Sequence, residues 1–175
     1  MNIYVMKAAM KGRPYIVNEE ALPVGYWQQF YAAGQSTHSW VPLKFRIERK
    51  SGKLADVLGW IGGVSLYSQK AVELLKAATK GELQFVLFGD VGDRPYWIIS
   101  RVPCIPDLAP ESIVKAAAVF CLPGNELREV LVKESVPETV VTKRLSGFEF
   151  RRRDKAHLKA LFLGKDVNDF PGMLP

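Results

Sequence analysis

The sequence lacks long apolar runs. Its longest apolar stretch, Ala116 to Leu122, has seven residues, whereas a helix that crosses a bilayer needs about 20. The N-terminus also lacks the order of basic region, apolar core and small-residue cleavage site that a secretory signal requires. These features predict a cytoplasmic protein with no membrane partner.

Cysteine and histidine are scarce. The two cysteines, Cys104 and Cys121, predict free thiols in a reducing compartment, with a single disulfide between them as the alternative. The two histidines, His38 and His157, lie far from each other and from the cysteines. Structural zinc needs four ligands at short spacings, and a catalytic cysteine or serine needs a neighbouring base. The sequence therefore predicts neither a metal site nor nucleophilic catalysis.

Loops that bind phosphate are also missing. Two G-x-x-G strings, Gly59 to Gly62 and Gly89 to Gly92, contain no basic residue between their glycines. Asp90 and Asp93 suit a hairpin turn, because aspartate and glycine both tolerate turn conformations. No enzyme activity and no cofactor are predicted, although a small hydrolase with a carboxylate pocket would leave no signature in a sequence.

The formal net charge of +6 is spread along the chain rather than concentrated. Arg151-Arg152-Arg153 is the one dense basic cluster. Charge runs usually mark solvated faces, which is the first interpretation of this one. The alternative function that it suggests is a nucleic-acid-binding or regulatory module, with binding that weakens steeply as salt rises.

What is present is the composition of an ordinary globular protein, with 48% apolar and 24% charged residues. A length of 175 residues predicts one domain covering 1–175. Within it, residues 1–63 form an N-terminal part with strands and an aromatic segment, 64–150 form the central core, and 151–175 form a C-terminal extension.

The stretch from Val64 to Val102 has the clearest local signals, reading as helix, strand, turn and strand. Ser68 is the expected N-cap of the helix. Four apolar residues fall on one helical stripe: Ala71, Leu74, Leu75 and Ala78. Leu83 to Phe88 and Tyr96 to Val102 are rich in β-branched and aromatic residues, which predicts a hairpin with a long turn from Gly89 to Pro95.

The flanking regions predict further short elements. Strands are expected over Ile3 to Ala8, Tyr15 to Val17, Val41 to Ile47 and Phe148 to Arg151, the last half-buried, and a second hairpin joins Lys115 to Leu122 with Leu127 to Lys133. Helical segments are expected over Leu54 to Gly63 as a short turn and break, from a Ser135 capping box to Arg144, and over Lys155 to Leu163. The predicted fold is α+β, a mostly antiparallel sheet of hairpins flanked by a few short helices.

Three blocks, in order along the chain, carry a family resemblance. The first runs from Leu54-Ala55-Asp56 through Ser68 to Leu75. The second is the hairpin that ends in the strand Tyr96 to Val102, followed by Asp107, and the third runs from Leu131 through Leu145-Ser146-Gly147 to Phe150. Together they resemble a bacterial family of polymorphic-toxin immunity proteins, an α+β immunity domain formerly catalogued as a domain of unknown function.

This resemblance implies a cytoplasmic inhibitor that binds a cognate toxin protein without catalysis, and a homo-oligomer is compatible with it. It implies no particular binding residues, because contact surfaces vary within such families. Exposed turns, the aromatic segment and the basic cluster are therefore the candidates for partner contacts. These candidate residues are Trp27, Asp90, Asp93, Arg94, Arg151, Arg152 and Arg153.

Overall fold

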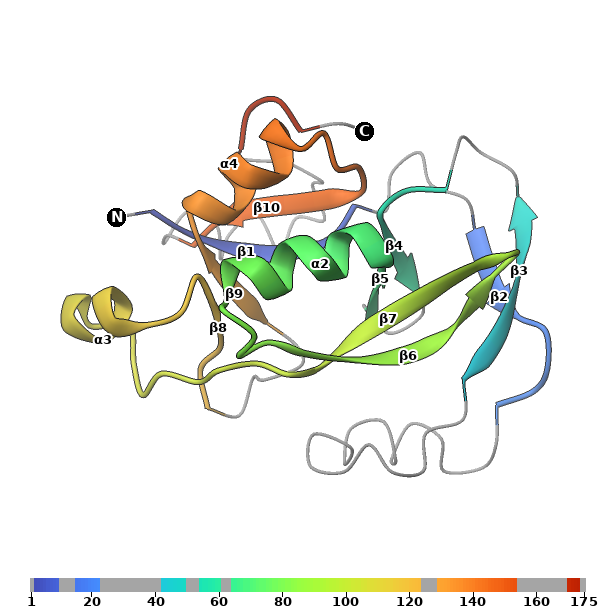
Figure 1. The fold of residues 1–175 in the computed structure, drawn as a ribbon, viewed down its shortest axis with the longest axis horizontal. Helices are drawn as coiled ribbons and strands as arrows, with labels where there is room; N and C mark the ends of the chain where they lie inside the picture. The colour runs from blue at the N-terminus through green and yellow to red at the C-terminus, as the bar shows by residue number, and fades with distance from the viewer. Residues whose placement is uncertain are drawn as a thin grey trace.

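The computed structural model of the protein describes residues 2–9, 15–22, 42–49, 54–60, 64–123, 129–153 and 170–173. Figure 1 shows a smaller sheet on the left, a larger sheet on the right and a helix that crosses the middle of the molecule. The expected helix over Lys155 to Leu163 and the aromatic segment around Trp27 lie outside the described residues.

The smaller sheet has four strands in the order β10-β1-β9-β8, and every neighbouring pair is antiparallel. Its strands are β1 (Ile3–Ala8), β8 (Val119–Phe120), β9 (Val130–Lys133) and β10 (Phe148–Arg152). The first strand of the chain therefore lies between two strands from its last third. This sheet depends on contacts between residues far apart in sequence.

The larger sheet has six strands in the order β2-β3-β6-β7-β5-β4. They are β2 (Tyr15–Asn18), β3 (Leu43–Arg49), β4 (Val57–Trp60), β5 (Val64–Ser68), β6 (Gln84–Val91) and β7 (Arg94–Arg101). The β3–β6 pair is parallel, and the other pairs are antiparallel. The predicted β6–β7 hairpin is confirmed at the centre of this sheet.

Among the described residues, three short helices accompany the sheets: α2 (Gln69–Ala78), α3 (Pro110–Lys115) and α4 (Ser135–Thr142). The predicted start of α2 is confirmed, because the Ser68 side chain accepts the Ala71 N–H at 3.3 Å. Leu75 on the predicted stripe is fully buried. The capping box at Ser135 is wrong, since Glu134 occupies the N-cap and no side chain caps that helix end.

The α+β expectation is met in its coarse form, but strands predominate and form two sheets where one was expected. The segment before α2 is also different. Leu54 to Gly63 was expected to contain a helical turn, whereas Val57 to Trp60 forms β4, which pairs with β5. The expected break at Gly62 and Gly63 lies outside the described residues. Three of the four β4 residues are buried, and burial against the sheet outweighs the local helical signal.

The hydrophobic core joins the two sheets. One cluster combines residues of both sheets with α2 and α4, and includes Tyr4, Tyr67, Leu75, Val140 and Phe148. A second cluster lies on the other side of the larger sheet, where the rings of Phe45, Trp60 and Phe88 have centroids 5.1 to 5.6 Å apart. A third lies on the far side of the smaller sheet. Both faces of each sheet therefore bury apolar side chains.

The Asp56 carboxylate connects the two sheets and the start of α2. The Ser146 backbone N–H and hydroxyl donate to Asp56 Oδ2 at 2.8 Å and 3.1 Å, and the Ser68 hydroxyl donates to Oδ1 at 3.4 Å. A backbone hydrogen bond joins two of the same residues, since the Ser68 N–H donates to the Asp56 carbonyl at 2.8 Å. We call Asp56, Ser68, Ser146 and Gly147 the sheet junction.

Gly147 allows this close approach. Its φ of +88° is a left-handed conformation, and a Cβ added there would lie 2.0 Å from the Val57 carbonyl oxygen. Its own carbonyl accepts the Ala9 N–H at 2.8 Å, which ties β1 to the same point. Only glycine satisfies both the backbone angle and the space.

Helices α2 and α4 end in the same way, each with a basic residue in the left-handed region. The Arg144 N–H donates to the Val141 carbonyl and the Leu145 N–H to the Val140 carbonyl, at 3.0 Å and 3.1 Å. This is the bond pattern of a Schellman motif, in which glycine is usual at the position that Arg144 occupies with φ +51°. Lys80 takes that position in α2, with φ +52°.

Replacing Asp56 with alanine should lower the free energy of unfolding by about 1 to 3 kcal/mol, because the Ser146 N–H loses its acceptor in a partly buried place. Urea denaturation measures this change. The matched control is Asp93→Ala in an exposed turn, which should change stability by no more than about 0.5 kcal/mol. Equal effects of the two variants would contradict a structural role for the junction.

Replacing Arg144 with glycine should raise the free energy of unfolding by about 0.5 to 1 kcal/mol. Relief of the left-handed conformation is worth about 1 to 2 kcal/mol, and the added backbone freedom of glycine offsets about 0.5 to 1 kcal/mol of that gain. The neighbour Lys143 has φ −83°, so Lys143→Gly should destabilise instead. Loss of stability in Arg144→Gly would contradict the assignment of this helix end.

Candidate functional site

The three arginines of the basic cluster, predicted as a solvated face or a partner contact, differ from one another in burial and in ion-pair partners. Arg151 is 6% exposed and forms an ion pair with Glu149, so the solvated interpretation is wrong for this residue. The reason is that β10 is buried on both faces, and buried charges require partners. Arg153 is partly buried against Glu129, with its Nε 2.8 Å from Oε1, whereas Arg152 is exposed.

The three candidates in the hairpin, Asp90, Asp93 and Arg94, are exposed and close together in the sequence. The predicted long turn is wrong, because Val91 pairs with Arg94 and only Gly92 and Asp93 lie between them. Gly92 has φ +61°, the angle that a two-residue type II′ turn requires at its first central position. Asp90 and Arg94 are thus strand residues, held by the ladder. Trp27, the remaining candidate, lies outside the described residues.

A β-bulge in β6 changes which side chains of this strand lie on each face of the larger sheet. Leu87 pairs with Trp97 and Gly89 pairs with Tyr96, so Phe88 is the extra residue. Phe88 is fully buried in the second core cluster. The bulge shifts the alternation by one residue, and Leu87 and Asp90 consequently share the opposite face.

That opposite face is exposed near the β6–β7 turn, beyond the residues that pack into the shared core. Lys44 of β3 pairs with Asp90, and Asp90 pairs with Pro95 of β7. Leu87 is 37% exposed, Trp97 is half-buried, and the charged side chains and Pro95 are exposed. We call this surface the open sheet face, defined by Lys44, Arg46, Leu87, Asp90, Pro95 and Trp97.

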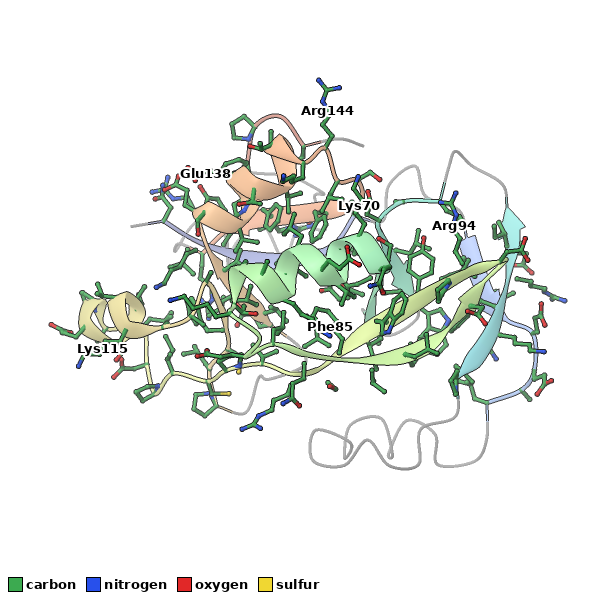
Figure 2. The ribbon with its side chains drawn as sticks, in the orientation of Figure 1. Lys70, Phe85, Arg94, Lys115, Glu138 and Arg144 are labelled. Carbon is green, nitrogen blue, oxygen red and sulfur yellow. The ribbon has the colours of Figure 1, made fainter. Side chains whose placement is uncertain are left out.

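A buried tyrosine on the opposite side of the larger sheet anchors β7, one of the strands that form the open sheet face. The Tyr96 hydroxyl donates to the Ala55 carbonyl at 2.7 Å, next to the sheet junction. Burial raises the pKa of Tyr96 to about 12, with Arg94 lowering it and Asp56 raising it. The phenol therefore stays protonated at neutral pH and keeps donating. Figure 2 labels Phe85 near the start of β6, at the end of the hairpin away from the turn, and its ring lies edge-on to Tyr67 with centroids 5.7 Å apart.

Metal and acid–base groups do not gather in the described part of the chain. No group of three or more His, Cys, Asp or Glu side chains there is placed to hold a metal ion. Asp107 has its pKa lowered by the Ala109 N–H and the Ser112 hydroxyl, in an exposed turn before α3. His38 and His157 lie outside the described residues. Among the described helices, none has the length and apolarity that crossing a membrane requires.

Four residues of the open sheet face were missed as candidate contacts by prediction from sequence: Leu87, Trp97, Lys44 and Arg46. Part of the signal was available, since Lys44-Phe45-Arg46-Ile47 alternates charged and apolar residues as a strand with one exposed face does. Leu87 gave no signal of its own, because it lies on the same strand face as Phe85, which packs against the shared core, and only the folded structure leaves Leu87 exposed.

Comparison with known proteins adds no relative. No protein-family model matches the sequence, and no curated protein matches it.

Proposed function

We propose that this protein binds another protein without catalysis, and that its partner is a bacterial toxin domain that it neutralises. The observation that carries the binding role is the open sheet face. Its centre is apolar, with Leu87 37% exposed beside a half-buried Trp97, and its border is charged. Protein interfaces commonly combine an aromatic and aliphatic centre with a polar rim.

Rigidity favours the same role. Leu87 and Trp97 face each other on neighbouring strands, and Trp97 is also paired with Tyr67 of β5. Three adjacent strands thus hold the face in one conformation before binding. A preorganised surface loses less conformational freedom when a partner docks, which strengthens the complex. A stable complex would bury about 1,200 to 2,000 Å² in total.

The toxin class of the partner rests on the family resemblance. Asp56 and Ser68 belong to its first block, Ser146 and Gly147 to its third, and these residues form the sheet junction. The resembling blocks thus contribute to the framework. Lys44 and Arg46 of the open sheet face lie outside them, as part of a contact surface that varies between family members would.

The nucleic-acid alternative gains no support from the geometry. It requires three neighbouring arginines that reach phosphate groups. Arg151 is instead buried against Glu149, and Arg153 pairs with Glu129. Only Arg152 of the cluster is exposed.

The toxin assignment predicts rescue of growth. A toxin domain encoded beside this gene should stop cell growth when expressed alone, and co-expression of this protein should restore growth and yield a co-purifying complex. Growth arrest that persists, with no complex, for every plausible neighbouring toxin would contradict the assignment. The open sheet face could still bind another protein, so the two parts of the proposal are separable.

The binding surface predicts a specific effect of Leu87→Glu. A charge at the centre of the face should weaken the complex at least about tenfold in Kd, because central apolar contacts carry most of the binding energy. Isothermal titration calorimetry with the toxin domain measures this. Stability should change little, since Leu87 is exposed.

Val114→Glu is the matched control for that variant. Val114 is the other exposed large apolar residue in the described part of the chain, at 71%, and it lies on α3. Figure 1 places α3 at the opposite end of the molecule from β2 and β3. The control should bind normally. Weaker binding by Val114→Glu, with normal binding by Leu87→Glu, would move the interface to α3.

A further inference from the structure

Cys104 and Cys121 lie directly opposite each other, although they are 17 positions apart in the sequence. They form a parallel β-bridge beside β8. The Cys121 N–H donates to the Pro103 carbonyl at 2.9 Å, and the Ile105 N–H donates to the Cys121 carbonyl at 3.0 Å. These two bonds flank Cys104 and hold the two cysteines in register.

The two thiols also lie on the same side of this bridge. The Cys104 Sγ is 3.7 Å from the Val102 carbonyl oxygen, and the Cys121 Sγ is 3.8 Å from the same oxygen. Neighbouring strands are about 4.8 Å apart, inside the range of about 4.4 to 6.8 Å that a disulfide spans between Cα atoms. The backbone thus already has the separation that a disulfide needs.

We propose that Cys104 and Cys121 form a reversible disulfide when the protein meets a low-molecular-weight disulfide such as oxidised glutathione. Cys104 is exposed and Cys121 is buried, which sets the order of events. The Cys104 thiolate attacks the glutathione disulfide and releases one glutathione thiol. The Cys121 thiolate then attacks the mixed disulfide at Cys104 Sγ and releases the second. Two protein thiols are oxidised and one glutathione disulfide is reduced to two thiols.

The bond would close a loop that carries α3. This segment leaves the larger sheet after Arg101 and returns to the smaller sheet at β8. No residue of α3 is fully buried, and its Ile113 packs at the margin of the third core cluster. A cross-link at the base of the loop restricts the unfolded chain and stabilises the folded one. This redox site is independent of the proposed toxin partner.

Oxidation of the full chain with oxidised glutathione tests the proposal. Thiol titration of the denatured protein should fall from two free thiols per chain to none, and peptide mass spectrometry should find a Cys104–Cys121 cross-link. The melting temperature should rise by about 5 to 10 °C and return to its starting value when a dithiol reductant is added. A stable glutathione adduct on Cys104, a disulfide-linked dimer, or two thiols that stay free would each overturn the proposal.

Two variants serve as controls. Cys104→Ser changes an exposed residue, so it should fold normally and show no shift in melting temperature with oxidised glutathione. Cys121→Ala removes the resolving thiol and should instead accumulate one glutathione on Cys104. If Cys121→Ala does not fold, the Cys104→Ser comparison still decides. An equal thermal shift in wild type and Cys104→Ser would show that the cross-link does not cause it.

Discussion

The hydrogen bonds around the Asp56 carboxylate are the interaction on which the two-sheet architecture depends. They bring Ser68, at the start of α2, and Ser146, just before β10, to one acceptor group. Gly147 brings the backbone of the smaller sheet against that of β4, because no side chain stands between them. The shared apolar core joins the same two sheets that this polar contact connects.

The open sheet face follows from the same arrangement. Tyr96 is anchored to Ala55, beside the junction, and Phe88 fills the aromatic cluster below the sheet. The bulge at Phe88 shifts the alternation of β6, so that Asp90 lies on the same outer face as Leu87. Packing of the buried side thus determines which residues a partner can reach. The pairing register of β6 and β7 therefore determines both which side chains enter the aromatic cluster and which lie on the open sheet face.

Prediction from sequence succeeded where neighbours in the chain supply the information. The Ser68 cap, the α2 stripe and the β6–β7 hairpin all rest on contacts within a few residues, and all are confirmed. It failed where burial in the folded sheets decides. Leu54 to Gly63 contains a strand, β4, whose largely buried residues pair with the adjacent β5, and Arg151 is buried because β10 is covered on both faces. Asp90, Asp93 and Arg94 were identified as exposed, but their neighbour Leu87 was not.

The sequence by itself determined the types of most elements, since capping, helical stripes and β-branched runs act over one or two turns of chain. It also determined that α and β elements combine in a largely antiparallel arrangement. The tertiary structure alone decided that the strands divide into two sheets, that β1 lies between strands from the end of the chain, and that Cys104 faces Cys121. These features arise from pairing between distant segments. Their energies depend on burial and hydrogen bonds that exist only after the chain has folded, so no local pattern encodes them.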